Sequence, residues 1–549
     1  MKKLLILILI MALLAAGGAL LLRSGGSSGR PIVTLEGLNA IYEDKILDAS
    51  DFDRIDGQVY LSFDFVKENL DNTIRFEKGE NTVIIAKGNE LKRLPLNSST
   101  GTLNEKEFSI RDPLIEKDGK ILLPIEVFIY QYDVTVRYIE EQQLIIIDRT
   151  DTAYVEGVVL KEELSIRREE DEKSDALSNL TKGDRIYVYE EYAKSYKVRA
   201  ETGVPGYVPK DAIKLDLKTD KFKHTLLPRE NEQVVSSPPT INLTWDYTYG
   251  KLEDGSTAQH IPGVNVIAPT WFSVTDGSGT VVDKGNWEYA KKYHDMGVAI
   301  WGTIDNSFDK DITKAFLASS SSRGRIIAQI MDYIKLYDLQ GINIDFENIE
   351  EDDRENLVQF TRELTACLKS IDKVSSIDVT PVSDSAEWSR VYDRKTLSSI
   401  VDYVVVMAYD QHWASSPVAG SVAQYKWVEG SINGLFKSIP VEKMILGIPL
   451  YTRLWIEENG QVTSKAIGME EAKKFIDENG IQTFWDEDSR QHFGTIEKDG
   501  KTYKIWLETE ESIVHKASLV TKYGLAGVGT WRKGFEQPHI WQALEKSLF

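Results

Sequence analysis

Two acidic residues interrupt an otherwise apolar stretch, GINIDFENI, at residues 341–349. Asp345 and Glu347 are two positions apart, and Asn343 precedes them at the same spacing. Residues two apart in a β-strand share a face, so the three polar side chains are expected on one side, with the acids roughly 6 to 7 Å apart. Two carboxyls packed in a partly buried site resist ionising together, so one keeps its proton near neutral pH. The pattern predicts Glu347 as proton donor and Asp345 as the charged partner. A polar layer inside a barrel is the structural alternative.

Eight short apolar runs alternate with amphipathic stretches from residue 241 to residue 549. Eight strands alternating with helices predict a (β/α)8 TIM barrel, an α/β fold whose catalytic groups collect at the carboxyl ends of the strands. The runs are INLTWDY, GVNVIAPTWF, GVAIWGTID, GINIDFE, SSIDVTPV, DYVVVMAYDQ, ILGIPLYTR and LAGVGTWR. Many of them end in a polar or aromatic residue: Asp246, Trp271, Asp305, Glu347, Asp410, Arg453 and Trp531.

The stretch QGINIDFE resembles the signature of glycoside hydrolase family 18, whose usual form is Asp-Gly-x-Asp-x-Asp-x-Glu. Gly341, Asp345 and Glu347 match it, whereas Gln340 and Asn343 stand where the family usually has aspartates. Three later runs agree with the family in order and spacing: VVMAYDQ resembles strand six, GIPLYTRLW strand seven and GVGTWR strand eight. The likeness covers residues 241–549.

Within that family the chain is most similar to the spore-germination and cortex-lytic subgroup. The motif of this subgroup reads Gly-x-Asn-x-Asp-Phe-Glu, so Asn343 is expected there. The stretch that begins FWDEDSRQHF also resembles the subgroup and implies a small α+β insertion before strand eight. The subgroup commonly carries LysM repeats, and none is evident in this sequence, which leaves a spore-specific or a vegetative role open.

The resemblance implies a retaining, substrate-assisted mechanism without metal or cofactor. The acetamido oxygen of the substrate attacks the anomeric carbon, Glu347 acts first as acid and then as base, and Asp345 stabilises the N–H of the oxazolinium-like intermediate. Tyr409 is the third implied catalytic residue and holds the acetamido carbonyl near attack geometry. Trp531 forms the floor under the sugar. The remaining candidates for substrate binding are Asn343, Met407, Asp410, Tyr451, Arg453 and Trp271.

Some of these candidates have equally plain structural alternatives. Tyr451 and Arg453 could only brace the mouth of the barrel. Trp245 and Trp271 lie at early strand ends, where packing in the core is as plausible as contact with sugar. His412 is expected behind Asp410 rather than on the substrate.

The N-terminal half reads as two smaller domains. Residues 31–150 contain a duplication, in which the segment from Gly57 aligns without a gap on the segment from Gly119. Each copy predicts a short helix and a two-stranded hairpin. This duplicated α+β domain resembles the N-terminal domain of copper amine oxidases, which implies a stalk or a contact module and no copper chemistry. Residues 151–216 predict a small β-barrel similar to bacterial SH3-like domains, which implies either binding of wall peptides or a spacer.

The ends of the domains and the N-terminus complete the predicted organisation. Residues 217–240 read as a linker with a Pro pair at 238 and 239. Residues 1–30 read as a signal anchor or signal peptide with a tether: two lysines, about nineteen apolar residues and then Arg23. Lys2 and Lys3 predict that the rest of the chain lies outside the cytoplasm, anchored or secreted at the cell surface.

Composition narrows the partners. The chain has 549 residues and a formal net charge of -21, which argues against nucleic-acid binding. The single cysteine, Cys367, excludes an internal disulfide and falls on the buried face of a predicted helix. The expected substrate is a β-linked 2-acetamido sugar polymer, and the expected reaction is cleavage of peptidoglycan by an N-acetylglucosaminidase. A chitinase and a glycan-binding scaffold without turnover are the alternatives, and the oligomeric state stays open.

Overall fold

The computed structural model describes residues 37–127, 131–150, 152, 154–216, 240–250 and 255–549. Contacts between Cα atoms divide the chain into two compact units. Of the described residues, the first unit comprises those from 37–72 and 115–216, and the second those from 73–114 and 240–549. The predicted anchor, tether and all but the last residue of the predicted linker lie outside the described residues.

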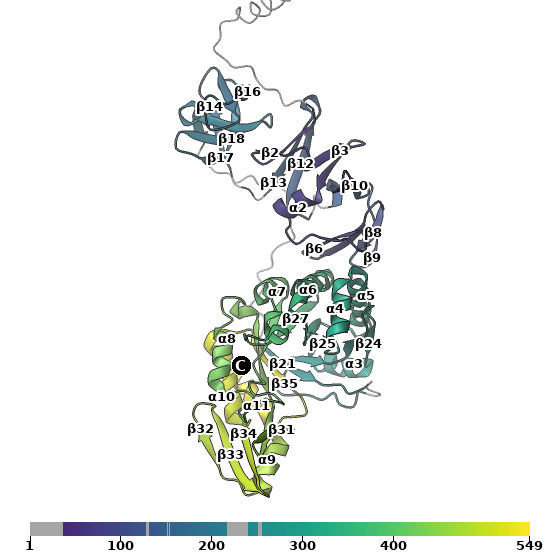
Figure 1. The fold of residues 1–549 in the computed structure, drawn as a ribbon, viewed down its shortest axis with the longest axis vertical. Coiled ribbons are helices and arrows are strands. Elements are labelled where there is room, and N and C mark those ends of the chain that lie inside the picture. Colours follow the sequence, from purple (N-terminus) through teal and green to yellow (C-terminus); the bar gives the residue numbers. More distant parts are fainter. Residues whose placement is uncertain (1–36, 128–130, 151, 153, 217–239, 251–254) are drawn as a thin grey trace, which may run out of the picture. The chain divides into compact units, whose positions relative to one another are not determined.

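A closed barrel of eight parallel strands forms the body of the second unit (Figure 1). Each strand pairs with its neighbours in parallel, and β22 pairs with both β21 and β25 to close the ring. The eight strands coincide with the eight predicted apolar runs. They are β21 (Ile241–Asp246), β22 (Val266–Pro269), β25 (Ala299–Asp305), β26 (Gly341–Asp345), β27 (Val374–Val379), β28 (Tyr403–Met407), β29 (Met444–Pro449) and β35 (Gly527–Trp531).

Helices cover the outside of this barrel, because each presents an apolar face to the strands. Asn286, Asp309 and Ser319 cap α3, α4 and α5 by accepting a backbone N–H through their side chains. The helices are α3 (Trp287–Asp295), α4 (Lys310–Ala318), α5 (Ser320–Tyr337), α6 (Arg354–Lys369), α7 (Arg394–Ile400), α8 (Tyr425–Asn433), α10 (Glu510–Tyr523) and α11 (Ile540–Leu548). Cys367 is fully buried on α6, where the helical spacing predicted it.

Two smaller elements decorate the barrel. A hairpin, β23 (Phe272–Val274) and β24 (Val281–Asp283), extends the sheet beside β25. The predicted α+β insertion follows β29 and forms a five-stranded antiparallel sheet with one helix. Its elements are β30 (Tyr451–Glu458), β31 (Gln461–Gly468), α9 (Met469–Glu478), β32 (Thr483–Asp486), β33 (Gln491–Lys498) and β34 (Lys501–Leu507).

A second five-stranded sheet of this unit comes from the N-terminal half of the sequence. It runs in the order β5 (Arg75–Glu77), β6 (Thr82–Lys87), β7 (Glu90–Pro95), β8 (Thr100–Leu103) and β9 (Lys106–Ser109). Its buried Ile84, Ala86 and Leu91 belong to the same apolar cluster as the barrel helices. This grouping cuts across the predicted 31–150 domain, because the hairpin of the first repeat packs on the barrel helix α6.

The duplication is visible in the pairing within the first unit. Strands β4 (Gln58–Ser62) and β11 (Lys120–Pro124) come from equivalent positions of the two repeats, and they pair antiparallel with Leu61 opposite Leu123. The first repeat continues into α2 (Phe63–Asn69), whereas the second has a 3-10 turn at Ile125–Val127. The other strands are β1 (Asn39–Tyr42), β2 (Lys45–Ile46), β3 (Phe52–Ile55), β10 (Ile115–Lys117), β12 (Val134–Ile139) and β13 (Leu144–Arg149).

The rest of the first unit is an antiparallel β domain of seven strands, with Val159, Ile166, Ile186 and Val198 in its core. Its strands are β14 (Val155–Val159), β15 (Leu164–Arg167), β16 (Ala176–Leu180), β17 (Arg185–Glu191), β18 (Ser195–Ala200), β19 (Pro205–Pro209) and β20 (Ile213–Asp216). The SH3-like assignment of this domain stays a prediction. Among the described residues, no helix combines the length and the apolar character that a membrane span requires.

Candidate active site

Strand β26 has the two-faced side-chain pattern that the sequence predicts. Ile342, Ile344 and Phe346 are buried in the apolar cluster that the barrel shares with its helices. Asn343, of the opposite parity, instead bonds to side chains of other barrel strands. Alternation along the strand therefore directs Asp345 towards the interior of the barrel as well, at its carboxyl end.

Asn343 is at the centre of a hydrogen-bond network inside the barrel. Its Oδ1 accepts from Trp245 Nε1 at 3.0 Å and from Thr303 Oγ1 at 3.3 Å. Its Nδ2 donates to Ser376 Oγ at 3.1 Å and to Asp378 Oδ1 at 2.7 Å. The amide thereby uses both of its hydrogens and both carbonyl lone pairs. The side chain of Asn343 therefore has no polar group left for the predicted contact with substrate.

Three carboxyls, those of Asp345, Glu347 and Asp378, lie close to one another at this end of the barrel. Burial, followed by repulsion from Asp345 and Asp410, raises the pKa of Glu347 well above its ordinary value. Burial and repulsion from Asp345 likewise raise the pKa of Asp378. No described Lys, Arg or His forms an ion pair with Asp345, Glu347 or Asp378. This cluster can therefore hold protons at neutral pH.

Burial disfavours the charged form of Asp345 as well. Burial, with repulsion from Asp305, raises the pKa of Asp345 to about 7. The predicted ionised state of Asp345 therefore requires a hydrogen-bond donor beside it at neutral pH, because desolvation penalises its carboxylate as it does that of Glu347. Asp305 is the register partner of Asp345 on β25, and its Oδ2 accepts from Ser273 Oγ at 2.7 Å.

The end of β28 and the start of β30 bring further predicted residues to the same place. Burial, and then the negative charges of Asp378, Asp345 and Glu347, raise the pKa of Tyr409 well above its ordinary value, so this phenol stays a hydrogen-bond donor. The rings of Tyr409 and Tyr451 are 6.5 Å apart. Met407 is buried at the end of β28, with the inward parity of Val405.

Asp410 is held from two sides. Tyr451 donates its hydroxyl to Asp410 Oδ1 at 2.7 Å, and Arg453 Nη2 lies 3.6 Å from the same oxygen. Arg453 is mostly buried, and its Nε has no hydrogen-bond partner among the described residues. Asp410 itself has a left-handed backbone, with φ of 56°. His412 bonds through Nδ1 to the carbonyl of Ser421, away from this group.

A cavity of about 330 Å³ opens beside these residues. It receives four of the predicted residues, and the ring of Trp531 packs against Trp245 and Tyr247. The lining consists of Tyr247, Tyr249, Asp410, Tyr451, Arg453, Ala466, Trp531, Arg532 and Phe535. Aromatic walls with a few polar groups suit a sugar, which presents apolar faces and hydroxyl edges.

Trp271 is not part of this group. It is fully buried and packs against Tyr289 of α3 and Tyr337 of α5, with ring centroids 5.4 Å and 5.2 Å away. Its predicted contact with substrate is wrong in this structure, because the residue faces the helices rather than the mouth of the barrel. The packing alternative applies to it and to Trp245, which is also buried.

Sequence reasoning missed Asp378. This residue is fully buried on β27 and bonds to Asn343, so it belongs to the carboxyl cluster. A signal was present in the run SSIDVTPV, where Ser376 and Asp378 alternate with apolar residues as Asn343 and Asp345 do on β26.

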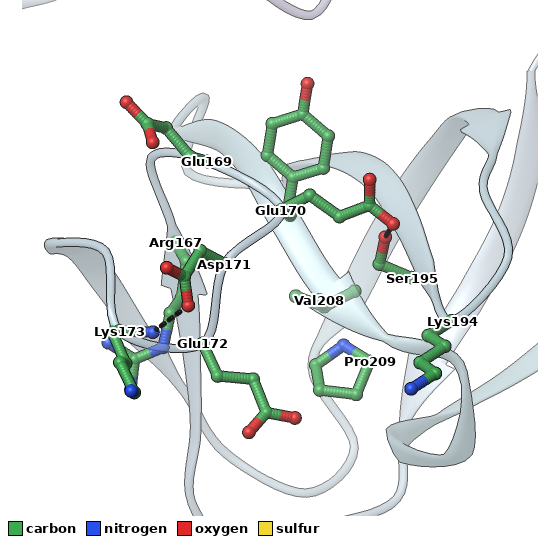
Figure 2. A pocket seen from close by; sticks show the side chains of 11 residues that line it. Arg167, Glu169, Glu170, Asp171, Glu172, Lys173, Lys194, Ser195, Val208 and Pro209 are labelled. Atoms are coloured by element: carbon green, nitrogen blue, oxygen red, sulfur yellow. Dashed lines mark hydrogen bonds between the residues drawn. The ribbon is translucent and has the colours of Figure 1, made fainter.

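A larger cavity, of about 590 Å³, lies in the β domain of the first unit (Figure 2). Four consecutive acids, Glu169 to Glu172, line it together with Lys194 and Ser195. Glu170 accepts from Ser195 Oγ at 2.9 Å, and the backbone N–H of Lys173 donates to Asp171 at 2.8 Å. These acids are exposed or hydrogen-bonded, and none is buried without a partner, so chemistry assigns the active site to the barrel despite the larger volume here.

The barrel and its site define a class of protein: an enzyme whose carboxyls act at the carboxyl ends of barrel strands, as in glycosidases. Comparison with known families agrees. Residues 266–535 match the model of "Glycosyl hydrolases family 18", and residues 46–147 match "Copper amine oxidase N-terminal domain". The barrel part of the chain is thus a glycoside hydrolase family 18 domain.

Several relatives come from Bacillus species. An uncharacterized glycosylase of Bacillus subtilis, YvbX, is 28% identical over 319 residues, which covers 55% of this chain and 91% of the relative. The cortical fragment-lytic enzyme of Bacillus anthracis is 25% identical over 251 residues, covering 45% of this chain and 58% of that enzyme. The chain thus spans less than two thirds of the second relative's length.

Among solved structures, the Bacillus cereus spore cortex-lytic enzyme SleL superposes with a TM-score of 0.51 at 22% identity. The match covers 57% of this chain and 75% of that enzyme. At this identity the likeness establishes the fold of the barrel.

Proposed function

We propose that this protein is an exported glycosidase that hydrolyses β-linked 2-acetamido sugar polymers, with peptidoglycan as the substrate and N-acetylglucosaminidase action as the reaction. The observation that carries the proposal is the pair of Asp345, which is buried, and Glu347, which is partly buried, at the end of β26; both have a raised pKa, and no cation among the described residues forms an ion pair with either. The Lys-flanked apolar segment at residues 1–23 supports an extracytoplasmic location, anchored or secreted.

The first step is a retaining, substrate-assisted displacement. Protonated Glu347 donates its proton to the glycosidic oxygen as the bond to the anomeric carbon breaks. The acetamido oxygen of the same sugar forms the new bond and gives an oxazolinium, whose N–H is stabilised by ionised Asp345. Tyr409, whose pKa is raised, donates a hydrogen bond that holds the acetamido group in position.

The second step returns the enzyme to its starting state. Glu347, now a carboxylate, accepts a proton from water as the water oxygen attacks the anomeric carbon. The oxazolinium ring opens, the sugar regains its acetamido group, and the configuration at the anomeric carbon is retained. Trp531 supplies an aromatic surface beside the cavity for the sugar ring.

The test uses the full chain and purified peptidoglycan, with release of reducing ends as the readout. Glu347→Gln should lower the rate by about 10²- to 10⁴-fold, because one proton donor and acceptor is lost. Glu350→Gln is the matched control, since Glu350 is half exposed and lies 3.3 Å from Lys310. Equal rates for wild type and Glu347→Gln reject the role of Glu347.

Mass spectra of the released fragments name the substrate and the bond. A reducing-end N-acetylglucosamine supports the proposal. Faster digestion of chitin oligomers than of peptidoglycan supports a chitinase instead. Binding of either glycan without any product supports a scaffold that has lost turnover.

A further inference from the structure

Two neighbouring strands of the barrel present a carboxyl at the same level. Strands β26 and β27 pair in parallel, with Asn343 opposite Ser376 and Ile344 opposite Ile377. One residue further along, Asp345 stands beside Asp378. Residues in register on adjacent strands point to the same face, and their Cα atoms are about 4.8 Å apart. The two carboxyls therefore face the same interior space.

Each of these carboxyls has one oxygen without a hydrogen-bond donor in the part of the chain that the structure describes. Asp345 Oδ1 and Asp378 Oδ2 are both buried and have no hydrogen-bond partner among the described residues. A buried acceptor without a donor costs about 1–3 kcal/mol, so native structures rarely leave one in place. Two such oxygens on adjacent carboxyls are satisfied together if a single proton lies between them.

Asn343 cannot supply that donor. Both of its amide hydrogens are already given to Ser376 and Asp378, and its carbonyl accepts from Trp245 and Thr303. The bond from Asn343 Nδ2 to Asp378 Oδ1 also fixes which oxygen of Asp378 remains for Asp345. The amide thus orients Asp378 and leaves its Oδ2 for the neighbouring carboxyl.

The other groups around Asp345 do not replace this donor. Asp305 faces it from β25 and Glu347 follows it on the chain, and both are acids. Tyr392 donates its hydroxyl to the carbonyl of Phe346 at 2.8 Å. Tyr409 is the remaining neutral group that faces the cluster, and the proposed mechanism uses its hydroxyl for the substrate.

We propose that Asp378 is a positioning residue for the reaction: it carries a proton on Oδ2 and donates it in a hydrogen bond to Asp345 Oδ1. Asp345 then stays ionised in a fixed orientation while Glu347 keeps its own proton for the leaving group. The raised pKa of Asp378, which burial and Asp345 cause, agrees with this protonation. The role in catalysis rests on the proposed function, whereas the shared proton does not.

Two substitutions of Asp378 separate hydrogen bonding from packing. Asp378→Asn keeps the shape, can accept from Asn343 and has an N–H that donates to Asp345, so it imitates the protonated acid at every pH. Asp378→Ala removes the donor. Asp372→Asn is the matched control, since Asp372 is exposed in the turn before β27 and has φ of 53°, which Asn tolerates.

The kinetic expectation is a difference between the two variants. Asp378→Ala should lower kcat by about 10- to 100-fold with little change in KM, and should move the acidic limb of the kcat profile to higher pH, because ionised Asp345 has lost its donor. Asp378→Asn should stay within about tenfold of wild type with the acidic limb nearly in place. Wild-type kinetics for Asp378→Ala, or the same profile and loss for both variants, overturns the proposal.

A measurement without substrate separates this inference from the proposed function. Infrared spectra at pH 8 should contain a carbonyl band of protonated carboxylic acid in wild type and in Asp372→Asn, and the band should weaken in Asp378→Asn. If the band weakens in Asp378→Asn but the wild-type protein cleaves no glycan, the shared proton is supported and the proposed function is rejected. An unchanged band in an active Asp378→Asn enzyme overturns the inference and leaves the proposed function intact.

Discussion

Two groups of buried charges lie on opposite sides of strand β26 and its helix α6, and their electrostatics are opposite. Inside the barrel, Asp345, Glu347 and Asp378 form no ion pair with any cation that the structure describes, and the pKa of each is raised. Beneath the β5–β9 sheet, Glu363 of α6 is just as buried but lies between Arg93 and Arg323. Burial alone would raise the pKa of Glu363, yet the two arginines outweigh it and leave that pKa below the ordinary value.

The paired network joins two parts of the chain that are far apart in sequence. Arg93 Nη2 lies 2.7 Å from Glu363, and its Nε lies 2.9 Å from Glu105. Arg323 Nη2 lies 3.0 Å from Glu363 and 2.7 Å from Glu77. Buried charges that have counterions hold the sheet on the barrel helices, whereas buried carboxyls without counterions can keep protons for chemistry.

The sharpest way to break the comparison is to remove the shared acid of the paired network. Glu363→Gln leaves two buried arginines short of a negative charge, so the free energy of unfolding should fall by about 3–5 kcal/mol. Chemical denaturation measures it, with Glu478→Gln on the exposed face of α9 as the control. The kcat of the folded variant should match wild type, and a loss of kcat without a loss of stability contradicts the division of roles.

Tyr409→Phe tests the other side of the comparison. Loss of the hydroxyl that positions the acetamido group should lower kcat by about 10²- to 10³-fold, as removal of one preorganised donor does. Steady-state kinetics on peptidoglycan fragments measure the effect, and the stability of the variant should stay close to wild type. An unchanged kcat for Tyr409→Phe would show that the acetamido group does not need the proposed hydrogen bond from Tyr409.

The two groups should respond to pH with opposite signs. The raised pKa of Asp345 means that its contribution to stability is full below about pH 4 and is lost as pH rises towards 7. The lowered pKa of Glu363 means that its contribution is present above about pH 4.5 and is lost as pH falls through the folded-state pKa.

Unfolding free energies at several pH values measure this difference. Relative to wild type, Asp345→Asn should gain stability between pH 4 and 8, by about 1.4 kcal/mol for each unit of pKa shift. The deficit of Glu363→Gln should shrink below pH 4.5. If the free energies of unfolding of wild type and Asp345→Asn change in parallel with pH, the pKa of Asp345 is not raised by folding.

A smaller effect is expected where the β5–β9 sheet caps a barrel helix. Glu80 accepts from Ser319 Oγ at 2.9 Å and from the backbone N–H of Ser321 at 3.0 Å, at the N-terminus of α5. Glu80→Gln should lower the free energy of unfolding by about 1 kcal/mol, the usual value of an N-terminal cap and its charge. The control is Glu107→Gln, at an exposed position of the edge strand β9. Equal stability of Glu80→Gln and Glu107→Gln would show that Glu80 does not stabilise the N-terminus of α5.

Much of the barrel was predictable from the sequence because its signals are local. Eight apolar runs mark eight strands, and alternation in GINIDFE separates the side chains of Asn343 and Asp345 from those of Ile342 and Ile344. The motifs around Tyr409 and Tyr451 supplied further residues that meet beside one cavity.

Other features depend on register and packing between distant segments. Trp271 lies two residues after the end of β22, and Trp531 ends β35, but Trp271 packs against helices α3 and α5. Asp378 joins the site because β27 lies in register beside β26, and no local pattern measures that register. Strand periodicity predicted a hairpin in the first repeat but not that it packs against α6.

The sequence by itself determined which residues form strands and which face of each strand is polar, since alternation and apolar runs act over a few neighbouring residues. Only the tertiary structure decided which buried acids form ion pairs with arginines and which do not. That choice depends on which strands and helices come together in space, and it separates Glu363, which stabilises the fold, from Glu347, which is proposed to move a proton.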